Sequence, residues 1–129
     1  ITFNNKEDFE QWRIDTISTS TICDENTSVV VSELKCIHRE TRFFIIDSKI
    51  ISASVYKING DIRTSTYINQ EEIDFVKDMI KLWTPNRAFV MDVATTDFGL
   101  KIVELNCINC SGFYEADIQK IIMSLNELE

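Results

Sequence analysis

A β-hairpin close to the C-terminus carries the residues with the clearest capacity for chemistry. Its strands are predicted over 87–95 and 100–109, joined by a short acidic bend around Phe98. A register centred on Phe98 places Asp92 directly opposite Glu104, with Asn106 two residues further along and therefore on the same face. The other pairs that this register predicts are Met91 with Leu105, Val93 with Val103, and Val90 with Asn106.

Asp92, Glu104 and Asn106 together have the donor types of a magnesium site. Directly opposed side chains of a sheet lie roughly 5 Å apart at Cβ, and like charges placed there destabilise the pair. Two carboxylates and an amide oxygen can converge if a hard cation such as Mg²⁺ lies between them. Without the cation, replacing Asp92 with Asn should leave the fold as stable, or more stable by up to ~1 kcal/mol. The alternative is an open sheet face whose acids point into water.

Basic residues are expected beside this acidic group. Glu40 and Arg42 share one face of a predicted strand, Lys57 ends the next strand, and Arg63 follows the turn. A cation held by carboxylates next to arginine and lysine is the arrangement that binds a polyphosphate. Ordinary ion pairing between neighbouring strands is the alternative for any one of these residues.

Composition restricts the classes of function. The chain has 129 residues, enough for a single domain with a core, and a net charge of −8, which argues against a binder of nucleic acid or of anionic membranes. No apolar run has the length of a membrane span and no signal peptide opens the sequence, so we expect a cytoplasmic protein. The three glycines are isolated, which excludes a Walker loop and a dinucleotide fingerprint within these residues.

The cysteines do not form a recognisable metal or disulfide pattern. Cys107 and Cys110 form one C-x-x-C pair, but Cys23 and Cys36 are too scattered to supply a second pair for zinc. We therefore expect reduced thiols that hold no zinc. His38 is the only histidine, which excludes a multi-histidine metal site.

Periodicity predicts an α+β fold with a largely antiparallel sheet and helices on one face. The expected helices cover 6–17, 70–83 and 114–128. Besides the hairpin, strands are expected over 28–35, 42–46 and 49–57. Asn69 and Glu72 have the spacing of an N-cap and its acidic N3 partner at the start of the second helix.

Several motifs resemble the C-terminal half of an ATP-grasp domain, the fold of ATP-dependent carboxylate–amine and carboxylate–thiol ligases. The run VVVSELKCIHRETRFFIID is similar to the family's strand and hinge, with Glu33 at the hinge and Glu40 seven residues later. Asp92 in FVMDVAT and the E-L-N of VELN resemble its magnesium ligands. The run ELNCINCSGFYEAD resembles more narrowly an ATP-grasp branch without a defined substrate.

The resemblance implies ATP and Mg²⁺ as cofactors and an acyl-phosphate intermediate, with a small-molecule or peptide carboxylate as the partner substrate. It assigns Mg²⁺ to Glu104 and Asn106, with Asp92 sharing that ion or a second one. Arg42 and Lys57 would neutralise phosphate charge, and Glu40 would accept from the ribose hydroxyls. The backbone of Glu33 and Leu34 would contact adenine.

The resemblance also implies a domain organisation. Residues 28–129 would form the nucleotide- and magnesium-binding subdomain, and residues 1–27 the tail of the preceding one. The subdomain with the phosphate-binding lysine and glycine-rich loop is not found among these 129 residues. We therefore expect a portion of a ligase that is inactive by itself. The alternative is a non-catalytic binding or scaffold module that keeps an ATP-grasp half-fold.

Overall fold

The computed structural model describes residues 1–128 and contains two compact units. The first unit covers Ile1–Lys35 and the second begins at Cys36. Each unit is described below by itself.

The first unit contains one helix, α1 (Lys6–Thr19), followed by an irregular segment. The helix begins after Asn5, whose side-chain oxygen accepts a hydrogen bond of 2.8 Å from the backbone N–H of Asp8. The strand predicted over 28–35 is wrong, because these residues lie in irregular structure and the valines among them are exposed. A β-branched run cannot hold a strand conformation without a neighbouring strand that pairs with its backbone groups.

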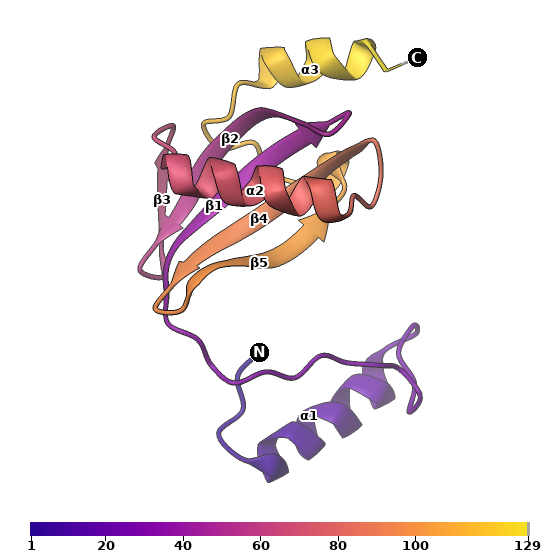
Figure 1. Cartoon of the computed structure of the whole chain (residues 1–129). Coiled ribbons are helices and arrows are strands. Elements are labelled where there is room, and N and C mark those ends of the chain that lie inside the picture. Colours follow the sequence, from indigo (N-terminus) through magenta and orange to yellow (C-terminus); the bar gives the residue numbers. More distant parts are fainter. Residues whose placement is uncertain (129) are drawn as a thin grey trace. The chain divides into compact units, whose positions relative to one another are not determined.

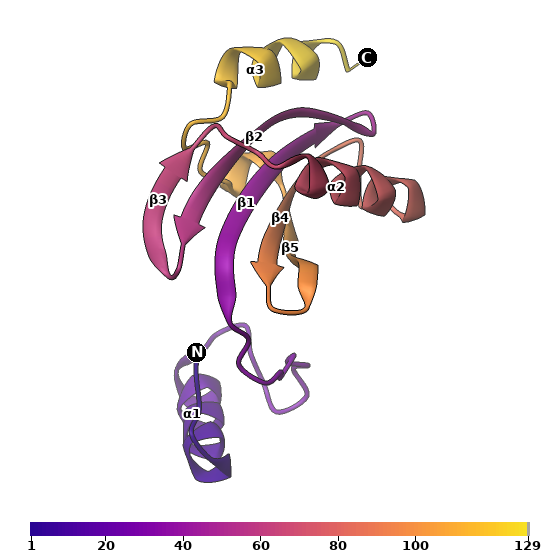
Figure 2. The same cartoon turned by 60° about the vertical axis from the view of Figure 1, so that its left-hand side comes forward.

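The second unit is built on a five-stranded antiparallel sheet (Figure 1). The strand order is β3-β2-β1-β4-β5, so β1 and β4 lie at the centre although about forty residues separate them in the chain. Figure 2 shows β3 at one edge and the β4–β5 hairpin on the other side of β1. The strands are β1 (Ile37–Ile46), β2 (Lys49–Ile58), β3 (Asp61–Ser65), β4 (Ala88–Thr96) and β5 (Gly99–Asn106).

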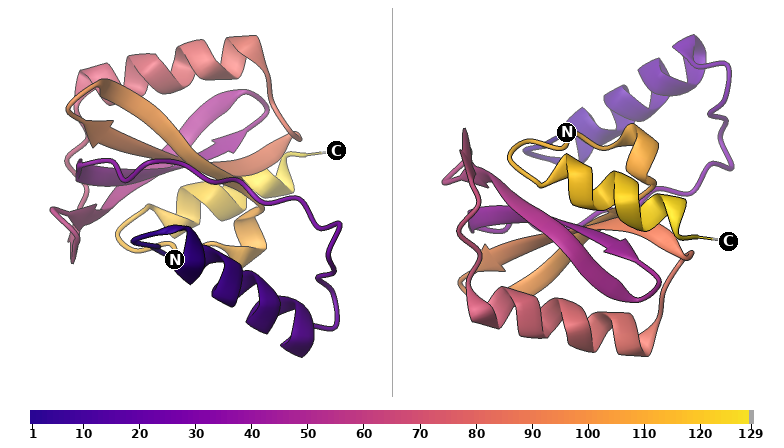
Figure 3. Two further views of the ribbon diagram at one scale, coloured as in Figure 1. Left: turned by 90° about the horizontal axis from the view of Figure 1, so that it is seen from below. Right: turned by 90° about the horizontal axis from the view of Figure 1, so that it is seen from above.

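Helices cover both faces of the sheet, as the two views of Figure 3 show. α2 (Gln70–Leu82) packs Val76 and Ile80 against alternate residues of β1, among them Phe43. α3 (Ile118–Asn126) packs Ile121 against the opposite face, where Phe44 lies. The predicted α+β class with an antiparallel sheet is confirmed. The prediction that the helices share one face is wrong, because adjacent residues of β1 point to opposite faces and both sets are apolar.

Other differences from the sequence-based prediction concern strand and helix ends. β3 was not predicted, and it takes the place of the strand expected at 28–35 in the number of elements. β1 begins five residues earlier than expected, at Ile37. α3 begins at Ile118 and not at Tyr114, because Tyr114 has a left-handed φ of 50° and Asp117 caps the helix. Within the described residues, no helix is long and apolar enough to cross a membrane.

Candidate functional site

A polar cluster occupies the sheet face opposite α2, in the middle of the second unit. Arg42 and Glu40 of β1 alternate with the residues that contact α2, so their side chains lie on this other face. The antiparallel pairing of β1 with β4 places Asp92 directly beside Arg42. The cluster is thus positioned by the two central strands, where backbone pairing on both sides restricts movement.

The Arg42 guanidinium forms a two-pronged ion pair with the Asp92 carboxylate. Arg42 Nε donates to Oδ1 at 2.9 Å, and Nη2 donates to Oδ2 at 2.7 Å. Asp92 is 1% exposed and Arg42 is 8% exposed, so the pair is shielded from solvent. These hydrogen bonds to Asp92 raise the pKa of Arg42, which therefore stays charged throughout the accessible pH range.

Two tyrosines pack against the same guanidinium. Tyr56 of β2 and Tyr114, in the segment before α3, stack with ring centroids 5.3 Å apart. Arg42 Cζ lies 5.1 Å from the Tyr56 centroid and 5.5 Å from that of Tyr114, both within cation–π range. Arg42 Nη1 also donates to the carbonyl oxygen of Gly112 at 3.2 Å. Arg42 therefore fastens the 112–114 segment to the sheet.

A β-bulge gathers the remaining polar groups around Glu40. The β1–β2 register shifts between Glu40 and Thr41, so Tyr56 becomes the extra residue beside the pair of Glu40 and Lys57. Tyr56 Oη donates to Glu40 Oε2 at 2.7 Å, and Lys57 Nζ lies 3.1 Å from Oε1. Burial, reinforced by the hydrogen bond to Glu40, raises the pKa of the Tyr56 phenol far above its ordinary value.

The predicted hairpin supplies the exposed side of the cluster. Asp92 pairs with Glu104, and the pairs Met91–Leu105 and Val90–Asn106 are also as predicted. Val93 pairs with Ile102 and not with Val103, because a bulge follows Asp92.

The like-charge contact expected in the hairpin is neutralised by Arg42. Its Nη2 lies 3.7 Å from Glu104 Oε1 as well as 2.7 Å from Asp92. Asn106 Nδ2 donates to the same Glu104 oxygen at 3.2 Å. The expectation that Asp92→Asn costs no stability is therefore wrong in its premise, because the partner of Asp92 lies on a third strand and not within the hairpin.

The residues assigned to magnesium fit a hard cation unequally. Glu104 is half exposed, and its carboxylate and the Asn106 amide oxygen are donors suited to Mg²⁺. Asp92 already accepts two hydrogen bonds from Arg42, and Tyr56 Oη lies 3.3 Å from its Oδ2. Asp92 could ligate a cation only by giving up part of this pairing, so the donor set fits with Arg42 as its competitor.

The predicted adenine-contacting residues are not part of this cluster. Glu33 and Leu34 belong to the first unit, where Glu33 forms an ion pair with Lys35, and Leu34 is 79% exposed. Glu40, the predicted ribose acceptor, belongs to the second unit, and both of its oxygens have partners there.

Sequence analysis missed three members of the cluster: Tyr56, Tyr114 and the Gly112 carbonyl. Alternation along β2 could have placed Tyr56 on this face, because Ser54 pairs with Arg42 two residues earlier. No local pattern places Tyr114, which reaches Arg42 only through the left-handed turn before α3.

Comparison with known proteins agrees with this geometry. The model of a family described as an ATP-grasp domain, family 3 of its clade, matches residues 3–125. No curated protein matches the chain. Since the family match extends over nearly the whole sequence, the chain belongs to this ATP-grasp domain family.

Proposed function

We propose that this chain is the ATP- and Mg²⁺-binding part of a ligase that joins a carboxylate to an amine or a thiol through an acyl-phosphate. The supporting observation is the convergence of Asp92, Glu104 and Asn106 with Arg42 on one sheet face of an ATP-grasp chain. Carboxylate and amide oxygens hold hard cations, and a guanidinium binds phosphate oxygens. The partner substrate would be a small-molecule or peptide carboxylate, and the enzyme would act in the cytoplasm.

The residues would divide the work by charge. Glu104, Asn106 and Asp92 would hold Mg²⁺, which when bound neutralises phosphate oxygens. Arg42 would then bind phosphate, because its present hydrogen bonds to Asp92 are the ones that a second cation near Asp92 would weaken. Lys57 would add a second positive charge beside it. Catalysis of this kind depends on positioning and charge stabilisation and needs no nucleophilic side chain.

Glu40 and the first unit would complete the nucleotide site. Glu40 would accept from the ribose hydroxyls, with Tyr56 keeping its carboxylate in place. The backbone of Glu33 and Leu34 would contact adenine, and residues 1–27 would continue the preceding ATP-grasp subdomain. That subdomain would supply the remaining phosphate contacts, so we expect weak nucleotide binding and no turnover from these 129 residues alone.

Amide NMR tests the proposal, because chemical shifts detect weak binding. A non-hydrolysable ATP analogue with Mg²⁺ should shift amides of residues 40–42, 56–57, 92 and 104–106, and omission of Mg²⁺ should reduce these shifts. Glu104→Gln should weaken the Mg²⁺-dependent shifts, whereas the exposed Glu71→Gln on α2 should not. Shifts confined to other parts of the chain, or shifts independent of Mg²⁺, would reject the site.

A non-catalytic binding module remains the second candidate, and one observation favours it. The Arg42–Asp92 pair is buried and complete without any cation, so it can serve as a purely structural link between β1 and β4. The two candidates differ in the response to Mg²⁺ with nucleotide: a binding module would show no shift at Glu104 and Asn106.

A further inference from the structure

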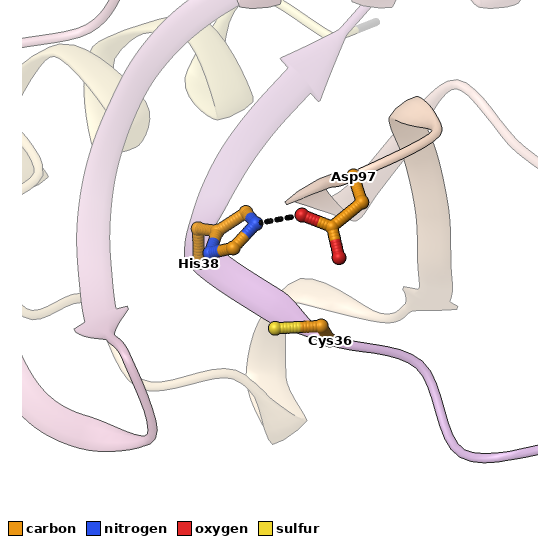
Figure 4. A group of neighbouring side chains, drawn as sticks. All are labelled: Cys36, His38 and Asp97. Carbon is orange, nitrogen blue, oxygen red and sulfur yellow. Dashed lines mark hydrogen bonds and ion pairs between the residues drawn. The ribbon is translucent and has the colours of Figure 1, made fainter.

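Three side chains of different chemistry meet at the other end of β1, outside the polar cluster. They are Cys36 and His38, at the start of β1, and Asp97, in the turn between β4 and β5 (Figure 4). Their potential ligand atoms all lie within 4.8 Å of one another. We propose that Cys36, His38 and Asp97 bind a transition-metal dication of the zinc class.

The donor set determines which metal the site would select. A thiolate, an imidazole nitrogen and a carboxylate oxygen together favour Zn²⁺ over Mg²⁺, which takes oxygen ligands. The site therefore differs in kind from the oxygen-only set of Glu104 and Asn106. Three protein ligands leave the fourth tetrahedral position open to water or to an outside ligand.

The distances require only a small adjustment. With metal–ligand distances of about 2.0–2.3 Å, adjacent ligand atoms of a tetrahedral zinc site lie roughly 3.3–3.8 Å apart. His38 Nε2 and Asp97 Oδ1 are now 2.6 Å apart, so a metal placed between them would separate these two atoms by about 1 Å. Both side chains are about half exposed, 46% for His38 and 56% for Asp97, and they can rotate by this amount without disturbing the core.

The backbone at the site is held in place from several directions. The His38 carbonyl oxygen accepts a hydrogen bond of 2.9 Å from the Asn59 N–H. In the turn that carries Asp97, Thr96 Oγ1 donates to the Gly99 carbonyl and accepts from the Phe98 N–H. The two elements that carry the ligands are thus ordered before any metal binds, which lowers the entropic cost of forming the site.

The site is separate from the proposed nucleotide site. Asp92 and Asp97 are five residues apart on β4 and its turn, which corresponds to about 16 Å of extended strand. The expectation of no zinc rested on the Cys107–Cys110 pair and on the scattered positions of Cys23 and Cys36. That pattern gives no signal for Asp97, which lies 59 residues from His38 in sequence.

Cobalt titration of the full chain tests the proposal. The chelator-treated, fully reduced protein should bind one equivalent of Co²⁺ with a thiolate-to-cobalt absorption band, and Zn²⁺ should abolish the band by displacement. Cys36→Ser should remove the band, and His38→Ala and Asp97→Asn should weaken binding on the order of tenfold or more. All three residues are exposed, so circular dichroism should show unchanged folds.

The matched controls use the other cysteines. Cys107→Ser and Cys110→Ser should keep the band, and a variant with Ser at 23, 107 and 110 should keep it with Cys36 as the only thiol. Zn²⁺ should also raise the melting temperature of the wild type but not of Cys36→Ser. Absence of the band in the wild type, or its loss in Cys107→Ser while Cys36→Ser retains it, would overturn the proposal.

Discussion

Arg42 determines how the acidic residues of the open sheet face behave. It contacts Asp92, Glu104, Gly112 and two aromatic rings, and only the Glu104 carboxylate among its ion-pair partners is largely exposed. A buried charge with a complete set of partners adds little net stability, but removal of one partner leaves the other charge uncompensated. The sign of a mutational effect here depends on this third residue and not on the two acids alone.

Asp92→Asn is therefore expected to destabilise the protein. The substitution keeps the size of the side chain but removes the negative charge from Arg42 in a shielded position, which should cost about 3 kcal/mol of unfolding free energy. Urea denaturation without metal measures this. Glu104→Gln is the control, since the half-exposed Glu104 lies 3.7 Å from Arg42 and should contribute less than ~1 kcal/mol. Equal stability of Asp92→Asn and the wild type would show that the pair carries no weight.

Tyr56 gives a prediction for alkaline pH. Burial and the hydrogen bond to Glu40 raise the pKa of Tyr56 above its ordinary value of 10.0, so the folded state keeps the phenolic proton when the unfolded chain loses it. The unfolded state then binds fewer protons, and stability falls as the pH rises above about 10. Tyr56→Phe should flatten this fall, whereas Tyr67→Phe, at an exposed position, should not. Denaturation midpoints between about pH 8 and pH 11 compare the three proteins; a Tyr56→Phe curve parallel to that of the wild type would contradict the assignment.

At the scale of elements, Glu72 connects α2 to the sheet. This buried carboxylate accepts from Thr41 Oγ1 at 2.6 Å and from the Asn69 N–H at 3.0 Å. Arg39 Nη2 lies 3.3 Å from it. One side chain thus satisfies the first turn of the helix and pairs with two residues of β1.

Glu72→Ala should cost about 3 kcal/mol, because it leaves a buried hydroxyl, a partly buried guanidinium and a helix N–H without their acceptor. Thermal and urea unfolding measure the loss. The neighbouring Glu71 is exposed, so Glu71→Ala should change stability by less than about 0.5 kcal/mol. Similar effects of the two substitutions would mean that the Glu72 contacts do not hold α2 in place.

Local patterns predicted the hairpin but could not predict its partners. Alternation and a turn fix which residues of β4 and β5 face one another, and Asp92–Glu104 follows from that alone. The bulge after Asp92 has no local signal, so the Val93–Val103 pair was wrong. The Arg42–Asp92 contact depends on strand order, which brings residues 50 apart together, and no periodicity records that order. The roles assigned to the site residues stay predictions until ligand binding is measured.

At the scale of the whole chain, the hydrophobic core of the described residues lies within the second unit. Both clusters of buried apolar residues belong to the sheet, α2, α3 and the segment between β5 and α3, whereas α1 contains no buried residue. The first unit has an aromatic contact group of Phe3, Phe9 and Trp12 but few apolar residues to bury. The folding free energy of the chain should therefore come almost wholly from residue 36 onward.

Fragments starting at residues 28 and 36 should consequently unfold with the same midpoint as the full chain, within the error of urea denaturation. The reason is that 28–35 form no strand and add no ladder hydrogen bonds to the sheet. Limited trypsin digestion of the full chain should cut after Lys35, in the irregular segment, and leave a resistant fragment beginning at Cys36. If the fragment from 28 is clearly more stable than the fragment from 36, residues 28–35 pair with the sheet in solution. The domain boundary would then lie at 27/28, as the family resemblance implies, and not at 35/36.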